Sequence, residues 1–163
     1  MTKHVRAGGV FTAPRAPSWR SAGFTLMEIM MVVLIIAILG GIAYPAYMKN
    51  VVRTNRVAAE GCLSQMSSYM ERYYTTYLRY DKAGKDANAA ANTLPALDCS
   101  SAQQSGRYYT FAFDSGQPTQ TTYKITATPI AGTQQARDTQ CPALSLDQGG
   151  QRYAGTGQVA NCW

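Results

Sequence analysis

One uncharged run near the N-terminus constrains this chain more than any other feature. From Ile29 to Met48 the sequence has 20 consecutive residues without a charged side chain, and Glu28 stands directly before them. At about 1.5 Å of rise per helical residue, this run reaches roughly 30 Å, the thickness of the hydrocarbon core of a bilayer. The sequence therefore predicts a membrane-spanning helix headed by a single carboxylate.

A short basic leader precedes this run. It ends at Gly23, the first residue of the motif Gly23-Phe-Thr-Leu-Met-Glu28, and it contains no acidic residue. Its cations are Lys3, Arg6, Arg15 and Arg20. The apolar region follows the glycine and stays with the protein, whereas that of a secretory signal peptide is removed. A basic leader, a glycine, a phenylalanine and then an acid together resemble the N-terminus of type IV prepilins.

This resemblance implies how the chain is processed. Residues 1–23 would be a leader peptide, and residues 24–48 the membrane-spanning half of a long helix that later enters a filament core. A prepilin peptidase would cut between Gly23 and Phe24, and a methylase would modify the new Phe24 amine. The residues for which the resemblance implies a role in assembly are Thr25, Glu28, Gly40, Gly41 and Pro45.

Glu28 has two interpretations. Within its own chain, a carboxylate in the first helical turn favours the helix dipole, can reach the interface and can pair with the Phe24 amine four residues earlier. The resemblance implies instead that Glu28 neutralises the Phe24 amine of a neighbouring subunit when helices bundle into a filament. We favour the second interpretation, because an acid within a membrane segment is a functional candidate by default.

Two glycines and a proline interrupt the far end of the span. Pro45 removes a helical hydrogen bond, and Gly40 and Gly41 weaken the helix further, so the sequence predicts a kink. The resemblance adds that this segment can melt into an extended stretch in filaments. The short basic leader favours a cytoplasmic N-terminus, although three cations in residues 49–56 make the charge count nearly even. We expect one pass through the inner membrane, with the C-terminal domain outside.

Composition limits the size of that domain. Removing the leader leaves 163 − 23 = 140 residues, and a long helix takes over a third of them, so the globular core is small. The formal charge of +6 includes the four leader cations, which leaves about +2 and only a weak argument for nucleic acid as a partner. An even number of cysteines in a chain that leaves the cytoplasm predicts disulfides, with three alternative pairings. These cysteines are Cys62, Cys99, Cys141 and Cys162.

Beyond the span, apolar residues at steps of three and four predict an amphipathic helix at 49–80, with one face packed on a sheet. Its expected buried stripe is Val52, Asn55, Ala59, Cys62, Met66, Tyr69 or Met70, Tyr73, Tyr77 and Tyr80. Tyrosines near its end could stack on single-stranded nucleic acid. Their helical spacing favours the alternative, in which Tyr69, Tyr73 and Tyr77 pack in the core.

Residues 81–106 have the composition of a linker, in which only Leu94 and Leu97 look buried. Alternating apolar residues then predict strands, and a turn near residues 114–118 makes the first two an antiparallel hairpin. The expected strands are Arg107–Phe113, Thr122–Thr128, Ala143–Leu146 and Gln151–Ala154. The sequence thus predicts an α+β fold, in which a long N-terminal helix packs on a small antiparallel sheet of about four strands.

Cys62 precedes the 81–106 connection and Cys99 lies within it, whereas Cys141 and Cys162 bracket the last segment. We favour a Cys62–Cys99 bond, which would tie the connection to the helix, and closing the 141–162 loop should add about 3 kcal/mol of stability. The fold resembles that of type IV pilins, with 81–106 as the αβ-loop, 107–140 as the sheet region and 141–162 as the disulfide-bounded D-region of a globular domain at 49–163. The C-terminal part of the chain has a narrower resemblance, to PilE-type minor pilins. The residues that carry it are Ala127–Ile130, Arg137–Asp138, Cys141, Leu144–Leu146 and Cys162–Trp163.

No catalytic constellation is expected. The only histidine, His4, lies in the leader, so neither a Ser-His-Asp nor a Cys-His arrangement can form in the processed chain. The cysteines are too dispersed for a CxxC zinc or redox site. We therefore expect a protein that is not an enzyme and that has no cofactor and no metal site.

The resemblance implies a structural subunit, a minor pilin, that acts in pilus assembly and initiation, twitching motility and adhesion. Its partners would be other pilins in a homo- and hetero-oligomeric filament, the prepilin peptidase and methylase, the inner-membrane assembly machinery and a tip adhesin. Before assembly the chain would be in the inner membrane, and afterwards in a pilus that crosses the periplasm to the cell surface.

Three alternatives stay open. A major pilin would share all these features and would differ in abundance. A DNA-uptake minor pilin would need basic residues on one face of the domain, for which the candidates are Arg107, Lys124, Arg137 and Arg152. A type II secretion pseudopilin is the least favoured alternative, because many of those lack the terminal disulfide and use a calcium site.

Overall fold

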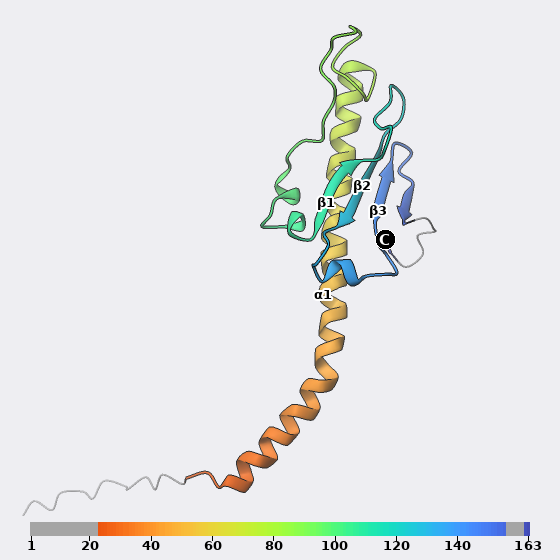
Figure 1. Ribbon diagram of the computed structural model, residues 1–163. Helices are drawn as coiled ribbons and strands as arrows, with labels where there is room; N and C mark the ends of the chain where they lie inside the picture. The colour runs from red at the N-terminus through yellow and green to blue at the C-terminus, as the bar shows by residue number, and fades with distance from the viewer. Residues whose placement is uncertain (1–22, 156–161) are drawn as a thin grey trace, which may run out of the picture. The chain divides into compact units, whose positions relative to one another are not determined.

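The computed structural model describes residues 23–155 and 162–163 (Figure 1). Contacts within the chain divide it into two units, Met1–Gly41 and Ile42–Trp163, and we describe each by itself. One helix, α1 (Leu26–Tyr77), contributes residues to both units. The predicted leader lies outside the described residues except for Gly23.

The first unit contains the apolar part of α1. Its first turn is closed by Thr25, whose hydroxyl and carbonyl oxygens both accept from the backbone N–H of Glu28, at 3.2 Å and 3.1 Å. Among the described residues, α1 alone is long and apolar enough to cross a membrane, with a mean hydropathy of 2.6 in its most apolar window. No residue of that window is buried.

Residues 40–45 are helical in the structure, with Pro45 inside α1. A Cβ atom built on Gly40 or Gly41 would meet nothing within 4 Å. Packing within this chain therefore does not require glycine at either position. The predicted melting of this segment concerns assembled filaments and stays a prediction.

In the second unit α1 ends at Tyr77, three residues earlier than predicted. Leu78 adopts a left-handed conformation (φ 56°) and donates its N–H to the Tyr74 carbonyl at 2.7 Å. The cause lies in Tyr80, whose N–H donates to the Gln120 carbonyl at 3.1 Å and whose ring packs on Tyr123 at 4.8 Å. These tertiary contacts draw the chain off the helix, although the spacing of Tyr80 matches the helical stripe.

Four strands form one antiparallel sheet in the order β1-β2-β3-β4. They are β1 (Tyr109–Phe113), β2 (Lys124–Pro129), β3 (Leu144–Asp147) and β4 (Arg152–Ala154). Each predicted strand is present, with ends shifted by up to two residues. Arg107 is not part of β1, because residues 105–107 form a short 3-10 helix, η2 (Ser105–Arg107).

The core lies between α1 and one face of the sheet (Figure 1). The helix contributes Ala59, Cys62, Leu63, Met66 and Met70, and the sheet contributes mainly Ile125, Ala127, Leu144 and Leu146, with Tyr109 and Tyr123 beside them. Because Ile125, Ala127, Leu144 and Leu146 alternate along their strands, one face of the sheet is apolar. The predicted α+β fold is confirmed.

Two disulfides close the small domain. Cys62 in α1 is joined to Cys99 in η1 (Asp98–Ser100), and Cys141 is joined to Cys162. The first bond holds the connection between helix and sheet against α1. Leu94 and Leu97 in this connection are half-buried against the core and not fully enclosed.

Candidate functional site

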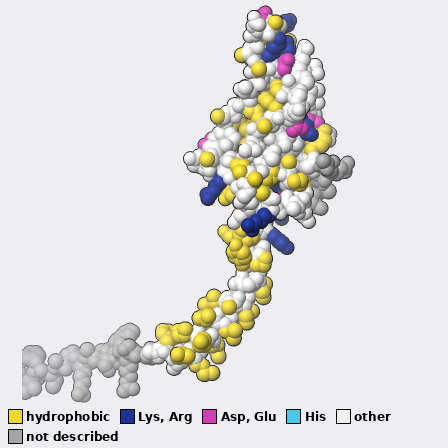
Figure 2. All heavy atoms as spheres, viewed as in Figure 1, with side chains coloured by type: hydrophobic (Ala, Val, Ile, Leu, Met, Phe, Trp, Pro, Cys, Tyr) yellow, Lys and Arg dark blue, Asp and Glu magenta, His cyan; other side chains and the backbone are white. Residues whose placement is uncertain are grey.

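The assembly segment predicted around Glu28 is exposed in the first unit. Large apolar side chains between Ile29 and Leu39 are 46% to 64% exposed, and they cover the described part of this unit in Figure 2. Glu28 lies in the first turn of α1 and makes no ion pair with the rest of the described chain. The positive end of the helix dipole favours a carboxylate at this position. Its pairing with a Phe24 amine stays a prediction, as do the roles of Gly23 and Thr25 in processing and assembly.

The structure does not bring the four DNA-contact candidates onto one surface. Lys124 opposes Asp147 across β2 and β3, on the sheet face away from α1, whereas Arg152 opposes the buried Leu146 on the helix side. In agreement with this placement, burial raises the pKa of the Glu60 carboxyl of α1, and the positive charge of Arg152 opposes that rise. Lys124 and Arg152 therefore lie on opposite faces of the sheet, because neighbouring strand residues alternate between faces.

Three of these candidates lie against aromatic rings. The Lys124 ammonium forms an ion pair with Asp114 at 3.0 Å and lies 4.7 Å from the centre of the Tyr153 ring. The guanidinium of Arg107 lies 5.8 Å from the Tyr108 ring centre, and that of Arg152 lies 5.1 Å from that of Trp163. Arg137 follows β2 in η3 (Gln135–Arg137) and is exposed.

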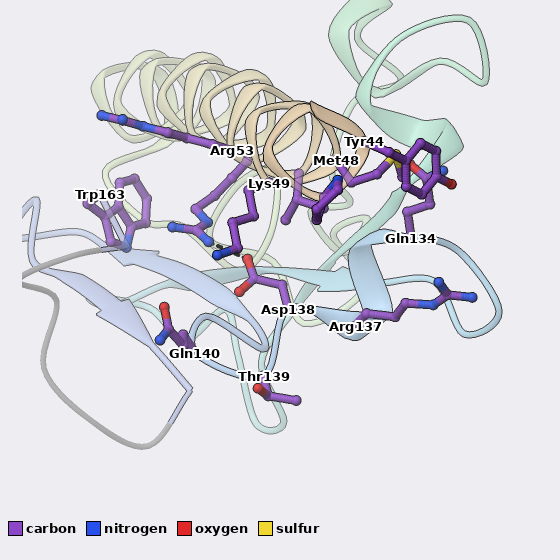
Figure 3. A pocket seen from close by; sticks show the side chains of 13 residues that line it. Tyr44, Met48, Lys49, Arg53, Gln134, Arg137, Asp138, Thr139, Gln140 and Trp163 are labelled. Atoms are coloured by element: carbon purple, nitrogen blue, oxygen red, sulfur yellow. Dashed lines mark hydrogen bonds and ion pairs between the residues drawn. The ribbon is translucent and has the colours of Figure 1, made fainter. Parts of the chain in front are cut away.

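A basic cleft lies at one end of the second unit, and the sequence alone did not reveal it. We call it the basal cleft; its volume is about 1000 Å³ (Figure 3). Its walls are α1 residues Tyr44, Pro45, Met48, Lys49, Val52, Arg53 and Arg56 and, opposite them, Gln134, Arg137, Asp138, Thr139, Gln140 and Trp163. Its α1 cations recur at steps of four and three residues, which places them on one helix face. That spacing was the signal that could have revealed half of the cleft.

One ion pair holds the two walls of the basal cleft together. Arg56 of α1 is hydrogen-bonded to the Asp138 carboxylate across 82 residues of sequence, and their side chains are only 13% and 7% exposed. Arg137, next to Asp138 in sequence, points away from it in Figure 3. Lys49 and Arg53 project from the helix and are exposed. The charged side chains that line the cleft, four cations and one carboxylate, give 4 − 1 = +3 charges.

A second polar cluster lies near the C-terminal end of α1. The Glu71 carboxylate accepts hydrogen bonds from the hydroxyls of Tyr80 at 3.2 Å and Tyr123 at 3.1 Å. Burial, with the neighbouring Glu71 charge, raises the pKa of Tyr80 to about 12 and that of Tyr123 still further. This cluster fastens the end of the helix to the β1–β2 connection and to the segment that directly follows α1.

The tyrosine prediction is only partly correct. Tyr69 packs against the core and is half-buried. Tyr73 and Tyr77 instead stack on each other at the surface, with ring centres 4.7 Å apart, and Tyr77 is exposed. The helix ends there before the sheet can cover its last turn.

No group of three or more His, Cys, Asp or Glu side chains that could hold a metal ion occurs in residues 23–155 and 162–163. All four cysteines are in disulfides and supply no thiol.

Two family models together match residues 20–145 of the chain. Residues 20–44 match the family described as the prokaryotic N-terminal methylation motif. The structure is similar to a type IV pilin from Shewanella oneidensis (21% identity, 69% of this chain and 97% of that one, TM-score 0.44). It is also similar to the non-core minor pilin PilV of Neisseria meningitidis (18% identity, 69% and 94%, TM-score 0.46). No curated protein matches the chain.

Residues 45–145 match a family described as type IV minor pilin ComP, DNA uptake sequence receptor. This match spans well over half of the 163 residues, including most of α1 in the second unit and the first three strands apart from the end of β3. The methylation motif adds the N-terminal region, which has the apolar helix expected of a pilin that is anchored in a membrane before assembly. The chain belongs to this family and is a minor pilin of type IV pili.

Proposed function

We propose that this minor pilin works as a filament subunit whose apolar helix leaves the membrane to pack against the helices of other pilins. The observation that carries the proposal is the exposed apolar surface of residues 29–39, none of which is buried by the chain itself. A surface of this size needs lipid or the helices of other subunits around it. Pilus assembly would exchange the first environment for the second.

Glu28 gives this packing its register. Inside a bundle of apolar helices a lone carboxylate is costly unless an opposite charge lies beside it. Cleavage between Gly23 and Phe24 creates such a charge, an α-amine four residues from Glu28, and we propose that each Glu28 pairs with the methylated amine of a neighbouring subunit. Gly40, Gly41 and Pro45 then allow the helix to bend as it leaves the membrane.

The test compares filament incorporation of Glu28→Ala with that of Asp86→Ala, which removes an exposed acid in the second unit. Filaments are sheared from cells and the subunit is quantified in the sheared and membrane fractions. Glu28→Ala should keep the membrane level and lose incorporation, whereas Asp86→Ala should match the parent chain. Equal incorporation of the Glu28 variant would refute the proposed pairing.

Within the pilus we propose a role in assembly and initiation, together with other minor pilins, the peptidase and methylase, the inner-membrane machinery and a tip adhesin. The subunit would start in the inner membrane with a cytoplasmic N-terminus and end at the cell surface. Deletion should abolish twitching and adhesion but leave protein secretion intact, and lost secretion would point to a pseudopilin. If mass spectrometry found the chain to be the most abundant pilin in sheared filaments, it would be a major pilin.

The family description favours a second candidate, a receptor for DNA. The exposed candidates that no ion pair engages in the described chain are Arg107, Arg137 and Arg152. We propose that two of them, Arg107 and Arg137, contact phosphates. Double-stranded fragments would be titrated onto the full chain in detergent over a range of salt. Each lost phosphate contact should reduce the salt slope by about 0.9, so replacing both arginines should reduce it by about 2, while Lys85→Ala should not. Absent or salt-independent binding would eliminate this candidate.

A further inference from the structure

We propose that the basal cleft binds the phosphate of an anionic phospholipid headgroup while α1 is in the membrane. The first argument is charge. Four cations and one carboxylate line the cleft, and the carboxylate, Asp138, is already occupied by Arg56. The exposed cations are Lys49 and Arg53 on the helix and Arg137 on the opposite wall. These cations thus come from both walls of the cleft (Figure 3).

The second argument is depth. Lys49 directly follows Met48, the last uncharged residue of the apolar run, and all cleft residues of α1 belong to the same unit. At about 1.5 Å of rise per residue, Arg53 lies about 7.5 Å beyond Met48 along the helix. The headgroup region on each side of a bilayer is about 5–8 Å thick. Lys49 and Arg53 thus fall at the depth of lipid phosphates.

The third argument is the mixed character of the walls. Pro45, Met48 and Val52 supply apolar surface, and Tyr44 and Trp163 supply aromatic rings. Tyrosine and tryptophan favour membrane interfaces because one end of each side chain is apolar and the other polar. A volume of about 1000 Å³ is at the upper end of ligand pockets, with room for a headgroup and the start of its acyl chains. A free phosphate would use only the cations, whereas a lipid uses the apolar wall as well.

The chain contains its own reporter for the test. It has two tryptophans, Trp19 and Trp163, so Trp19→Phe leaves the cleft residue as the sole tryptophan. The full chain with this substitution is reconstituted into nanodiscs of phosphatidylcholine with increasing fractions of phosphatidylglycerol. Acrylamide quenching of Trp163 fluorescence measures how far the cleft is covered. We expect protection that grows with phosphatidylglycerol and weakens at high salt.

Charge variants locate the binding site. Lys49→Gln, Arg53→Gln and Arg137→Gln should each raise the phosphatidylglycerol fraction needed for half-maximal protection by about fivefold. The matched controls Arg72→Gln and Arg107→Gln remove exposed cations outside the cleft and should leave that fraction unchanged. Thermal melts of all variants check that the domain is folded. Because the substituted side chains are exposed, the melting temperatures should be unchanged.

Other ligands give distinct outcomes in the same assay. Soluble glycerol phosphate is added to phosphatidylcholine nanodiscs, and a double-stranded DNA fragment is added to a second sample. Equal protection by soluble glycerol phosphate would overturn the lipid assignment in favour of a general anion site. Protection by DNA without protection by phosphatidylglycerol would overturn the lipid assignment in favour of nucleic acid. Absence of protection by all three ligands would overturn the proposal that the cleft binds an anion.

Discussion

Replacing Asp138 with alanine should strongly destabilise the second unit. Arg56 and Asp138 are 13% and 7% exposed at their side chains, so the substitution deprives a largely buried guanidinium of its carboxylate. Removing one partner of a buried ion pair costs about 3–5 kcal/mol, and we take about 3 because the cleft admits water near Arg56. For a domain of this size that corresponds to a fall of about 10 °C in melting temperature.

A double substitution separates the ion pair from the loss of side-chain volume. Arg56→Met with Asp138→Ala removes both charges, and such apolar replacements of buried pairs are often close to neutral. We therefore expect the double variant to melt above Asp138→Ala alone, with a coupling of about 2 kcal/mol. The assay is circular dichroism of the oxidised full chain in mild detergent, with Asp86→Ala as an exposed control.

The reasoning would be refuted if Asp138→Ala melted within about 2 °C of the parent chain, which corresponds to less than about 1 kcal/mol. It would also be refuted if the double variant were less stable by the full sum of the two single substitutions. Additivity of that kind would mean that the two charges do not interact.

Three further outcomes are expected. Removing the Cys62–Cys99 disulfide, which spans a sequence separation of 37, should cost about 4 kcal/mol in urea unfolding. The pKa of Tyr80 is raised to about 12, so the stabilising contribution of the neutral hydroxyl is complete below pH 10 and is lost between about pH 10 and 12. Tyr80→Phe should reduce this loss of stability, measured as the urea midpoint at a series of pH values. Gly106→Ala places a Cβ 2.1 Å from the Ser100 carbonyl oxygen and should cost about 2 kcal/mol or more, whereas Gly61→Ala, in open space on α1, should add about 1 kcal/mol in the same melts.

Local patterns predicted most of the fold. The uncharged run predicts the first half of α1, and the alternation of Tyr123, Ile125 and Ala127 places three buried residues beside β2 or in it. The end of α1 could not be predicted in this way, because Tyr80 keeps the helical spacing and is drawn away by contacts with Gln120 and Tyr123. Those partners are about 40 residues distant in sequence, beyond the range of any periodic pattern.

The binding surfaces were harder to predict than the fold. Choosing Lys124 and Arg152 by residue type ignored the strand pairing, which sends them to opposite faces of the sheet. The basal cleft depends on Arg137, which lies 81 residues beyond Arg56, the last α1 residue of the cleft. A helical repeat can predict that Lys49, Arg53 and Arg56 share a face, but only the fold shows what lies opposite them.

The Cys62–Cys99 bond also has a mechanical consequence for a fibre that is pulled. The chain runs from α1 to the sheet through the segment between these cysteines. Without this bond, unfolding of the 37-residue segment under tension would lengthen each subunit by roughly 125 Å of extended chain. The disulfide prevents this extension, so a force applied along the helix acts directly on the packing between α1 and the sheet.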